Sequence, residues 1–297
     1  MKDIIFVLSD FKAGTNILRG KKISECLNNM GVKCSCVTSI PKNVNNSILI
    51  FIGNFTGRYS ISLDGLQKLK SNNNKIILDV VDKLTYLNLY LEKETPYYYI
   101  LDGIIFPNKF SENHFMQDLS CKSTTIYHQY DSRLTDFPIN KSQDFGVCYV
   151  GVVYQDPYFM NPPDWLNITN IEIMPDINNI FKILKEYPIH FSHRSPQIQD
   201  YYFKPSTKIS IAAATNSVFV TSKDKTVVEL LGENYPLYIN EDMDKTNKLI
   251  NHLKLEFVNS NLDSYIELLK PIKEKLSINS ICKEYINFFK QLNQLNQ

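Results

Sequence analysis

The sequence is short of the features that mark several large protein classes. Its 297 residues include 10 glycines and 6 cysteines, and 32 Lys and Arg nearly offset 31 Asp and Glu, for a formal net charge of +1. Because this balance supplies no broad basic surface, we expect no nucleic-acid partner. The cysteines form neither a C-x-x-C pair nor a metal-binding spacing with histidine, a pattern typical of reduced thiols in the cytoplasm.

Long apolar runs are also missing. No stretch approaches the roughly 20 apolar residues that a membrane-spanning helix requires, and the apolar run at residues 4–8 is too short for a signal peptide. We therefore expect no transmembrane segment. Peripheral contact with a membrane stays open, although no segment is both amphipathic and strongly basic.

The common phosphate and metal signatures do not occur. The loop A-G-T-N-I-L-R-G around Gly14 matches neither G-x-G-x-x-G nor G-x-x-x-x-G-K-[ST], which weakens a nicotinamide cofactor and P-loop chemistry. Asp79 and Asp82 are spaced as D-V-V-D, which differs from the D-x-D pair that often holds a divalent ion. We expect neither a metal nor a resident cofactor.

What the sequence does contain is an alternation of short β-branched segments with amphipathic ones, the pattern of an α/β fold with parallel sheets covered by helices. In the first half the predicted strands are 4–9, 32–38, 48–53, 76–81, 104–107 and 125–128, with helices at 21–30 and 63–69. After a turn-rich stretch at 136–144, predicted strands follow at 145–151, 189–192, 218–221 and 237–239. Predicted helices in this half lie at 178–186, from 206, from 226, at 243–253 and as a pair over 262–295, and the proline-rich stretch 154–170 with Trp165 is predicted to be a loop.

Ionisable residues follow several of these strands. In open parallel sheets, ligands collect at the carboxyl ends of the strands. Asp79, Asp82, His128 and Asp131 lie at such ends in the first half. Carboxylates and imidazoles there can act as general bases, so all four are candidates, with no order among them.

The stretch F-K-P-S-T-K-I-S-I-A-A-A in the second half carries the strongest functional signal. Lys204 and Lys208 flank a predicted helix start at Ser206 and Thr207. Cations at a helix N-terminus are unfavourable unless an anion binds between them. Arg194 follows the preceding predicted strand, so three cations are expected to converge as a diphosphate clamp would.

Two segments resemble those of the two-domain, nucleotide-sugar-dependent glycosyltransferases of the GT-B type. They are A-G-T-N-I-L-R-G-K-K-I-S-E-C-L after the first strand, and the run from H-R through K-P-S-T-K to V-V-E-L-L. The resemblance implies two Rossmann-like domains facing across a cleft, namely an acceptor-side domain at 1–138 and a nucleotide-sugar-binding domain at 139–277, with a C-terminal helix at 278–297 that crosses back to the first domain. It also implies a metal-independent transfer of a sugar from a nucleotide-diphosphate sugar to a glycan, lipid-linked or other hydroxyl acceptor.

The same resemblance assigns roles by position. The acceptor-side loop would contain Gly14, Thr15, Asn16 and Arg19. The donor diphosphate would meet Arg194, Lys204, Ser206, Thr207 and Lys208. The nucleotide or its sugar would lie near Gly151 and Glu229.

One departure from the family pattern leaves the function open. The small-residue helix has Ile211 and Ala212 where retaining members carry a Glu-Ala pair, which leaves ribose recognition and the anomeric outcome undecided. A sugar-nucleotide epimerase would need several ionisable groups around the sugar, of which the second half offers His190, His193 and Glu229. We also consider a non-catalytic module that binds a glycan or a protein, and a structural α/β protein with solvated basic residues.

Overall fold

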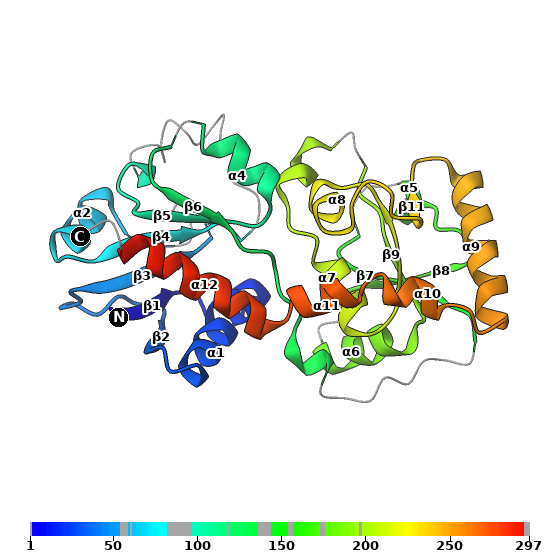
Figure 1. The fold of residues 1–297 in the computed structure, drawn as a ribbon, viewed down its shortest axis with the longest axis horizontal. Helices are drawn as coiled ribbons and strands as arrows, with labels where there is room; N and C mark the ends of the chain where they lie inside the picture. The colour runs from blue at the N-terminus through cyan, green and yellow to red at the C-terminus, as the bar shows by residue number, and fades with distance from the viewer. Residues whose placement is uncertain are drawn as a thin grey trace. The chain divides into compact units, whose positions relative to one another are not determined.

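The computed structural model describes residues 2–53, 59, 61–81, 97–117, 119–135, 144–153, 157–172, 176–195 and 198–293. The chain divides into two compact units (Figure 1). Unit 1 contains Met1–Gln129, Tyr202–Pro205 and Ile278–Gln297, and unit 2 contains Tyr130–Tyr201 and Ser206–Ser277. The chain thus leaves unit 1 after Gln129, before the boundary suggested at residue 138, contributes Tyr202–Pro205 to it, and returns to it for its last segment at Ile278.

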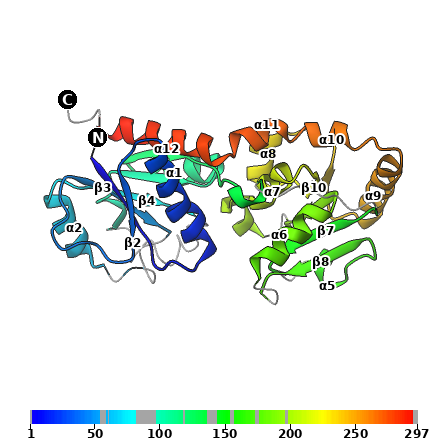
Figure 2. The ribbon, with the colours of Figure 1, turned by 90° about the horizontal axis from the view of Figure 1, so that it is seen from below.

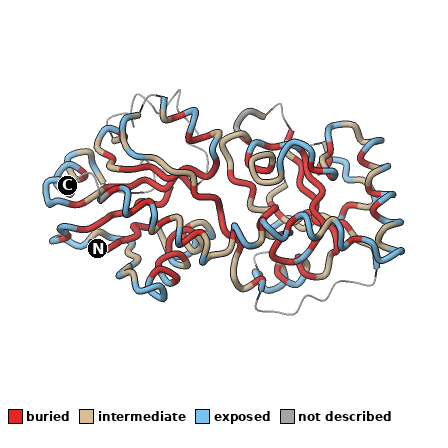
Figure 3. The backbone as a smooth tube through the Cα atoms, viewed as in Figure 1, coloured by how far each residue is buried: buried red, intermediate tan, exposed pale blue. Residues whose placement is uncertain are grey.

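Unit 1 is built on a parallel sheet of six strands in the order β2-β1-β3-β4-β5-β6. The strands are β1 Asp3–Val7, β2 Cys34–Val37, β3 Ser47–Ile52, β4 Lys75–Asp79, β5 Gly103–Phe106 and β6 Lys122–Thr125. Every residue of β3 is buried (Figure 3), and its continuous run S-I-L-I-F-I is typical of a strand covered on both faces.

Helices cover both faces of this sheet. They are the π-helix η1 Asn16–Lys22, α1 Ile23–Asn29, α2 Leu63–Ser71, α4 Lys109–Phe115 and α12 Ile278–Asn293. Leu66 of α2 and Phe115 of α4 pack with Ile5 and Val7 of β1. On the opposite face α1 and α12 lie side by side, as both ribbon views show (Figures 1 and 2).

The C-terminal helix α12 fits closely on unit 1. A Cβ added to Gly103 of β5 would lie 2.7 Å from Cζ of Phe288 and 3.3 Å from Cδ2 of Leu292. Glycine at this position therefore allows the helix to approach the sheet. Phe6 of β1 meets the ring of Tyr285 edge-on, with 6.0 Å between ring centroids.

A buried ion pair lies between η1, the sheet and α12. Nη2 of Arg19 donates to both carboxylate oxygens of Asp79 at 3.0 Å, and Nη1 donates to the carbonyl oxygen of Tyr127 at 3.0 Å. Tyr285 donates its hydroxyl to the same carboxylate. Burial raises the pKa of Tyr285 well above its ordinary value, so this hydroxyl stays protonated and remains a donor.

Unit 2 contains a second sheet, in the order β11-β10-β9-β7-β8 and also parallel. Its strands are β7 Val147–Gly151, β8 Leu166–Asn170, β9 Ile189–Ser192, β10 Val218–Ser222 and β11 Tyr238–Ile239. Its helices are α5 Pro157–Met160, α6 Ile177–Glu186, α7 Thr207–Ala214, α8 Lys225–Leu231, α9 Met243–Val258, α10 Asp263–Glu267 and α11 Lys270–Lys275. Short 3-10 turns occur at η2 Ser132–Leu134 and η3 Gln199–Phe203.

The structure corrects several predicted elements. The strand predicted at 125–128 is β6 at Lys122–Thr125, and α4 was not predicted. The proline-rich stretch predicted as a loop contains α5 and β8, and Trp165 packs against Phe191 and donates to Oδ1 of Asn247 at 2.8 Å. The predicted C-terminal helical pair is three helices, α10 to α12. The helix predicted at 21–30 begins earlier, in η1. Gly20 of η1 contacts Leu8 at a distance that a Cβ would prevent.

Replacing Asp79 by Asn should destabilise the protein by about 3–5 kcal/mol, because the Arg19 guanidinium would keep its charge in the core without a counter-ion. The matched control is Asp3→Asn, which removes the exposed pair with Lys33 and should change stability by about 1 kcal/mol or less. Urea unfolding followed by circular dichroism measures both. Equal and small effects in the two variants would contradict a buried, charged pair in the core.

Candidate functional site

The candidate site lies at the carboxyl edge of the sheet in unit 2. The strand order reverses between β7 and β9, and in open α/β sheets such a switch point is where ligands bind. Gly151 ends β7, and Arg194 follows β9 by two residues. The chain then reaches the N-terminus of α7, where Lys208 stands in the first turn.

Lys208 is the central cation of this edge. Its Nζ lies 4.5 Å from the ring centroid of Tyr149, and a Cβ on Gly151 would come within 2.8 Å of it. Although part of the side chain reaches solvent, burial of the ammonium group and the nearby charge of Arg194 lower the pKa of Lys208 to about 7. Among the residues that the structure describes, no carboxylate forms an ion pair with it.

Arg194 is held next to this lysine. Its Nη1 lies 3.4 Å from Oδ2 of Asp224, its backbone N–H donates to Oγ of Ser222 at 2.8 Å, and its guanidinium lies 5.8 Å from the ring centroid of Tyr201. Burial raises the pKa of Asp224. Asp224 forms an ion pair with Arg194, and its charge acts on Lys208 without a direct ion pair among the described residues. Two cations near one buried carboxylate favour binding of an anion.

The N-terminus of α7 adds hydrogen-bond donors. Ser206 stands at the N-cap position and is buried, yet its side chain makes no capping hydrogen bond. Its Oγ has no partner among the described residues. The first backbone N–H groups of a helix have no partner within the helix and form a common anion site. The sequence-based prediction that Ser206 and Lys208 share one helix start agrees with this geometry.

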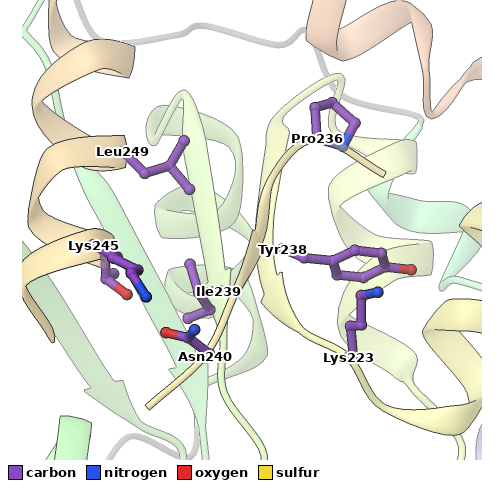
Figure 4. A pocket seen from close by; sticks show the side chains of 8 residues that line it. Lys223, Pro236, Tyr238, Ile239, Asn240, Lys245 and Leu249 are labelled. Carbon is purple, nitrogen blue, oxygen red and sulfur yellow. The ribbon is translucent and has the colours of Figure 1, made fainter. Parts of the chain in front are cut away.

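Two pockets lie along the ends of β10 and β11, and Arg194 lines one of them. One, of about 420 Å³, is lined by His193, Arg194, Ser222, Lys223, Ile239, Asn240, Glu241 and Asp242. The other, of about 460 Å³, shares Lys223, Ile239 and Asn240 with it. Figure 4 shows Lys223 beside the ring of Tyr238 on one side of β11, and Lys245 with Leu249 of α9 on the other.

The remaining residues predicted for the donor side lie in several different elements. Lys204 belongs to unit 1, where its carbonyl oxygen accepts from Nδ2 of Asn108 at 3.3 Å, whereas Arg194 and Lys208 belong to unit 2. Thr207 begins α7. Glu229 lies in α8, and its charge contributes to the raised pKa of Asp224. His190, considered for an epimerase, bonds to a backbone carbonyl oxygen at 2.8 Å inside the core.

The four candidate bases separate into distinct environments. Asp79 is fully buried against Arg19, and Asp82 lies outside the described residues. Asp131 begins η2 and pairs with the Arg133 guanidinium at 2.6 Å. His128 is 7% exposed, and its Nε2 has no hydrogen-bond partner in the described part of the chain. Among the described candidates, the His128 imidazole therefore has a nitrogen lone pair available to a ligand.

The residues predicted for the acceptor-side loop also differ in their exposure to solvent. Gly14 is exposed at the start of the helical segment, and Thr15 follows it without a side-chain cap. Asn16 is fully buried, with Nδ2 donating to Oγ of Ser9 at 2.9 Å. Arg19 is taken up by the ion pair in the core, which gives it a structural role.

Sequence reasoning misses Asp224 and Tyr149. Asp224 is the N-cap residue of α8, and its Oδ1 accepts from the N–H of Val227 at 2.8 Å. An Asp directly before a helix is a sequence signal for an N-cap. The prediction missed it because it started this helix near Thr226. Tyr149 gives no sequence signal that separates it from an aromatic residue of the core.

Neither a metal-binding cluster nor a membrane-spanning helix occurs in the described ranges. No group of three or more His, Cys, Asp and Glu side chains there is arranged to hold a metal ion. No helix of those ranges has the length and apolar character needed to cross a bilayer.

The comparisons with known proteins show the fold. No family model matches the sequence, and no curated protein matches it. The structure is similar to a sucrose-phosphate synthase from Thermosynechococcus elongatus, with a TM-score of 0.64, 10% identity, and coverage of 99% of this chain and 100% of that chain. It is also similar to HepE of Anabaena in complex with UDP and glucose, with a TM-score of 0.63, 10% identity, and coverage of 98% of this chain and 100% of that chain. A glycosyltransferase from Rickettsia africae is similar with a TM-score of 0.60, 11% identity, and coverage of 98% of each chain. The chain has the GT-B fold of two Rossmann-like units, and the fold predicted from sequence is confirmed.

The low pKa of Lys208 makes anion binding at this edge depend on pH. In the protein without a ligand, Lys208 is about half charged near pH 7. The affinity of the protein for inorganic pyrophosphate should therefore fall by up to about tenfold per pH unit as the pH rises from 7 to 9. In Lys208→Arg the guanidinium stays charged, so this part of the slope should vanish. Titration calorimetry across the pH range measures both. Parallel slopes in the two proteins would show that Lys208 does not contact the anion.

Burial of Lys208 also links folding stability to pH. Its folded-state pKa lies below the unfolded value, so the unfolded chain binds more protons between about pH 7 and 10.5. The destabilisation by this group is thus fully present below pH 7 and is relieved as the pH rises through that window.

Proposed function

We propose that the chain is a glycosyltransferase. It transfers a sugar from a nucleotide-diphosphate sugar to the hydroxyl of a glycan, a lipid-linked sugar or another acceptor, without a metal ion. Unit 2 binds the donor, and unit 1 supplies the acceptor side. The single observation that carries this proposal is that Arg194, after β9, lies close enough to Lys208, in the first turn of α7, to lower its pKa, while Asp224 forms an ion pair with Arg194.

The arrangement suits a diphosphate. Arg194 can form paired hydrogen bonds to phosphate oxygens, Lys208 adds a point charge, and Ser206 adds a hydroxyl with no partner among the described residues. Binding of the anion would draw the proton equilibrium of Lys208 toward the charged form. A bound anion would therefore keep both side chains charged at a pH where Lys208 alone is partly neutral.

The pocket lined by Arg194 could hold the nucleoside part of the donor. It shares Arg194 with the cation cluster and extends over Ser222 to Asn240, so a nucleotide whose diphosphate meets Arg194 would place its nucleoside there. HepE of Anabaena, which shares the fold, has been solved with UDP and with UDP-glucose. UDP is for that reason the first nucleotide to test.

The chemistry follows from charge. When the bond between the sugar and the diphosphate breaks, negative charge grows on the leaving phosphate, and preorganised cations and helix N–H groups stabilise it. Arg194 and Lys208 would take the role that a divalent ion plays in other transferases. Glu229 and Gly151 would lie near the nucleotide or its sugar.

His128 is the base that this proposal favours. Burial and the nearby charge of Arg19 hold the pKa of His128 well below its ordinary value, and a hydrogen bond to the backbone of Val81 fixes the ring. The imidazole is neutral at physiological pH, so Nε2 can accept the proton of an acceptor hydroxyl as the new bond forms. Asp79 and Asp131 are each paired with an arginine.

Truncation of the clamp should weaken UDP binding. Arg194→Ala and Lys208→Ala should each lower affinity by about 10- to 100-fold, because each removes a charge-assisted hydrogen bond. Lys254→Ala, an exposed lysine of α9, is the matched control and should bind as the wild type does. Calorimetric titration with UDP gives the three affinities, and wild-type affinity in both clamp variants would remove the proposed diphosphate site.

Turnover separates an enzyme from a binding module. Slow release of glucose from UDP-glucose, or of the sugar from another sugar nucleotide, without an acceptor supports the transferase. Tight binding of donors with no turnover of any of them, with and without acceptors, would instead support a non-catalytic module. Interconversion of the bound sugar nucleotide into its epimer would support an epimerase.

Replacement of His128 by Ala should lower kcat for transfer by about 10²- to 10⁴-fold while leaving UDP affinity unchanged, because the imidazole belongs to unit 1. Asp131→Asn, the rival candidate, should lower kcat less. Steady-state kinetics and calorimetric titration on the same preparations provide the two readouts. A larger loss in Asp131→Asn than in His128→Ala would transfer the role of base to the carboxylate.

A further inference from the structure

We infer that the sugar held on the acceptor side of unit 1 is neutral, an unphosphorylated carbohydrate recognised through its hydroxyl protons. This inference rests on the proposed function and specifies the class of acceptor. The observation behind it is a set of three buried atoms, on residues of the segments around η1 and after β6, that can only accept hydrogen bonds and have no partner in the described part of the chain: Oδ1 of Asn16, Oε1 of Gln129 and Nε2 of His128.

The orientation of the Asn16 amide is fixed by its neighbours. Nδ2 donates to Oγ of Ser9 at 2.9 Å and to the carbonyl oxygen of Asp10 at 3.0 Å. A carbonyl oxygen cannot donate, so the amide cannot be turned the other way without losing this bond. Oδ1 is therefore the atom left over, and Asn16 is fully buried.

The same logic fixes Gln129 and His128. Nε2 of Gln129 donates to the carbonyl oxygen of Leu18, which leaves Oε1 as an acceptor on a side chain 3% exposed. The His128 ring bonds to the backbone of Val81, and because the ring is neutral, its unbonded Nε2 carries a lone pair and no proton. All three atoms thus require a donor.

The three residues belong to one place in unit 1. Gln129 bonds to Leu18, two residues after Asn16, and Arg19 of the same helix bonds to the carbonyl oxygen of Tyr127. Val81, to which His128 bonds, follows β4. The segment after β6 therefore crosses the carboxyl edge of the sheet and lies against η1, a π-helix of the kind that often marks a ligand site.

Charge argues against a phosphate at this place. Within the described ranges, Arg19 has the one unpartnered donor of the cluster, Nε, but its charge is balanced by Asp79 at 3.0 Å, and His128 is neutral. A phosphate would meet three acceptor atoms without a net positive charge. Hydroxyl groups of a neutral sugar would supply the donors that these atoms need.

Matched pairs of sugars test this directly. The probes are glucose with glucose 6-phosphate and N-acetylglucosamine with its 6-phosphate, titrated by saturation-transfer NMR into the whole chain in the presence of UDP. The neutral member of a pair should bind at least about tenfold more tightly. Preference for the phosphorylated members, or no binding of any neutral sugar, would overturn the inference.

Variants connect the preference to the cluster. Asn16→Leu and Gln129→Met should each weaken binding of the neutral sugar about tenfold, whereas Gln67→Met, an exposed glutamine of α2, should not. Circular dichroism and UDP titration verify that each variant is folded. Unchanged sugar binding in both cluster variants would mean that only water occupies these atoms, and the inference would fail.

Titration with UDP distinguishes failure of this inference from failure of the proposed function. Failure of UDP to bind would remove the proposed function. If UDP binds and a phosphorylated sugar binds with it, the proposed function stands and this inference fails. Loss of the phosphorylated sugar in Lys12→Ala would then show that Lys12, the exposed cation of the loop before η1, determines the acceptor class.

Discussion

The structure of the site depends on an imbalance of charge. In unit 2, Arg194 follows β9 and Lys208 stands in the first turn of α7, and the buried carboxylate of Asp224 forms an ion pair with Arg194. Burial of a charged group is unfavourable unless a counter-charge compensates for it, and the lowered pKa of Lys208 reflects that cost in the free protein. A doubly charged phosphate group would reverse the balance, so the two cations are best understood as one half of an interaction whose other half is the ligand.

The backbone makes this imbalance tolerable. Glycine at position 151 leaves room for the ammonium group, which a Cβ would approach within 2.8 Å. Tyr149 covers the same group with its ring, and cation–π contact replaces part of the lost hydration. Asp224 uses one oxygen to cap α8, which keeps it in place but limits how much charge it can neutralise.

Unit 1 shows a contrasting use of charge. Arg19 and Asp79 are matched to each other and to Tyr285, so this pair joins η1 and α12 to the sheet and leaves no charge for a ligand. Three buried side chains beside η1, Asn16, His128 and Gln129, keep an acceptor atom without a partner among the described residues. The proposals thus assign an anion to unit 2 and a group with hydrogen-bond donors to unit 1.

The sequence predicts most strands of the two sheets and most helices, because these depend on local periodicity. It does not predict β8 or α4. It does not predict the pairing of Arg19 with Asp79, since the two lie 60 positions apart and each also fits a ligand-binding role. Lys204 is assigned to the donor cluster by sequence proximity, whereas packing places it in unit 1. The polypeptide passes from unit 1 to unit 2 after Pro205.

A crystal structure of the chain with UDP would decide whether the cation pair binds the donor. We expect phosphate oxygens within hydrogen-bond distance of the Arg194 guanidinium and the Lys208 ammonium group, at the N-terminus of α7. Phosphates bound elsewhere on the molecule, with neither of these side chains in contact with the nucleotide, would contradict a diphosphate clamp at this edge.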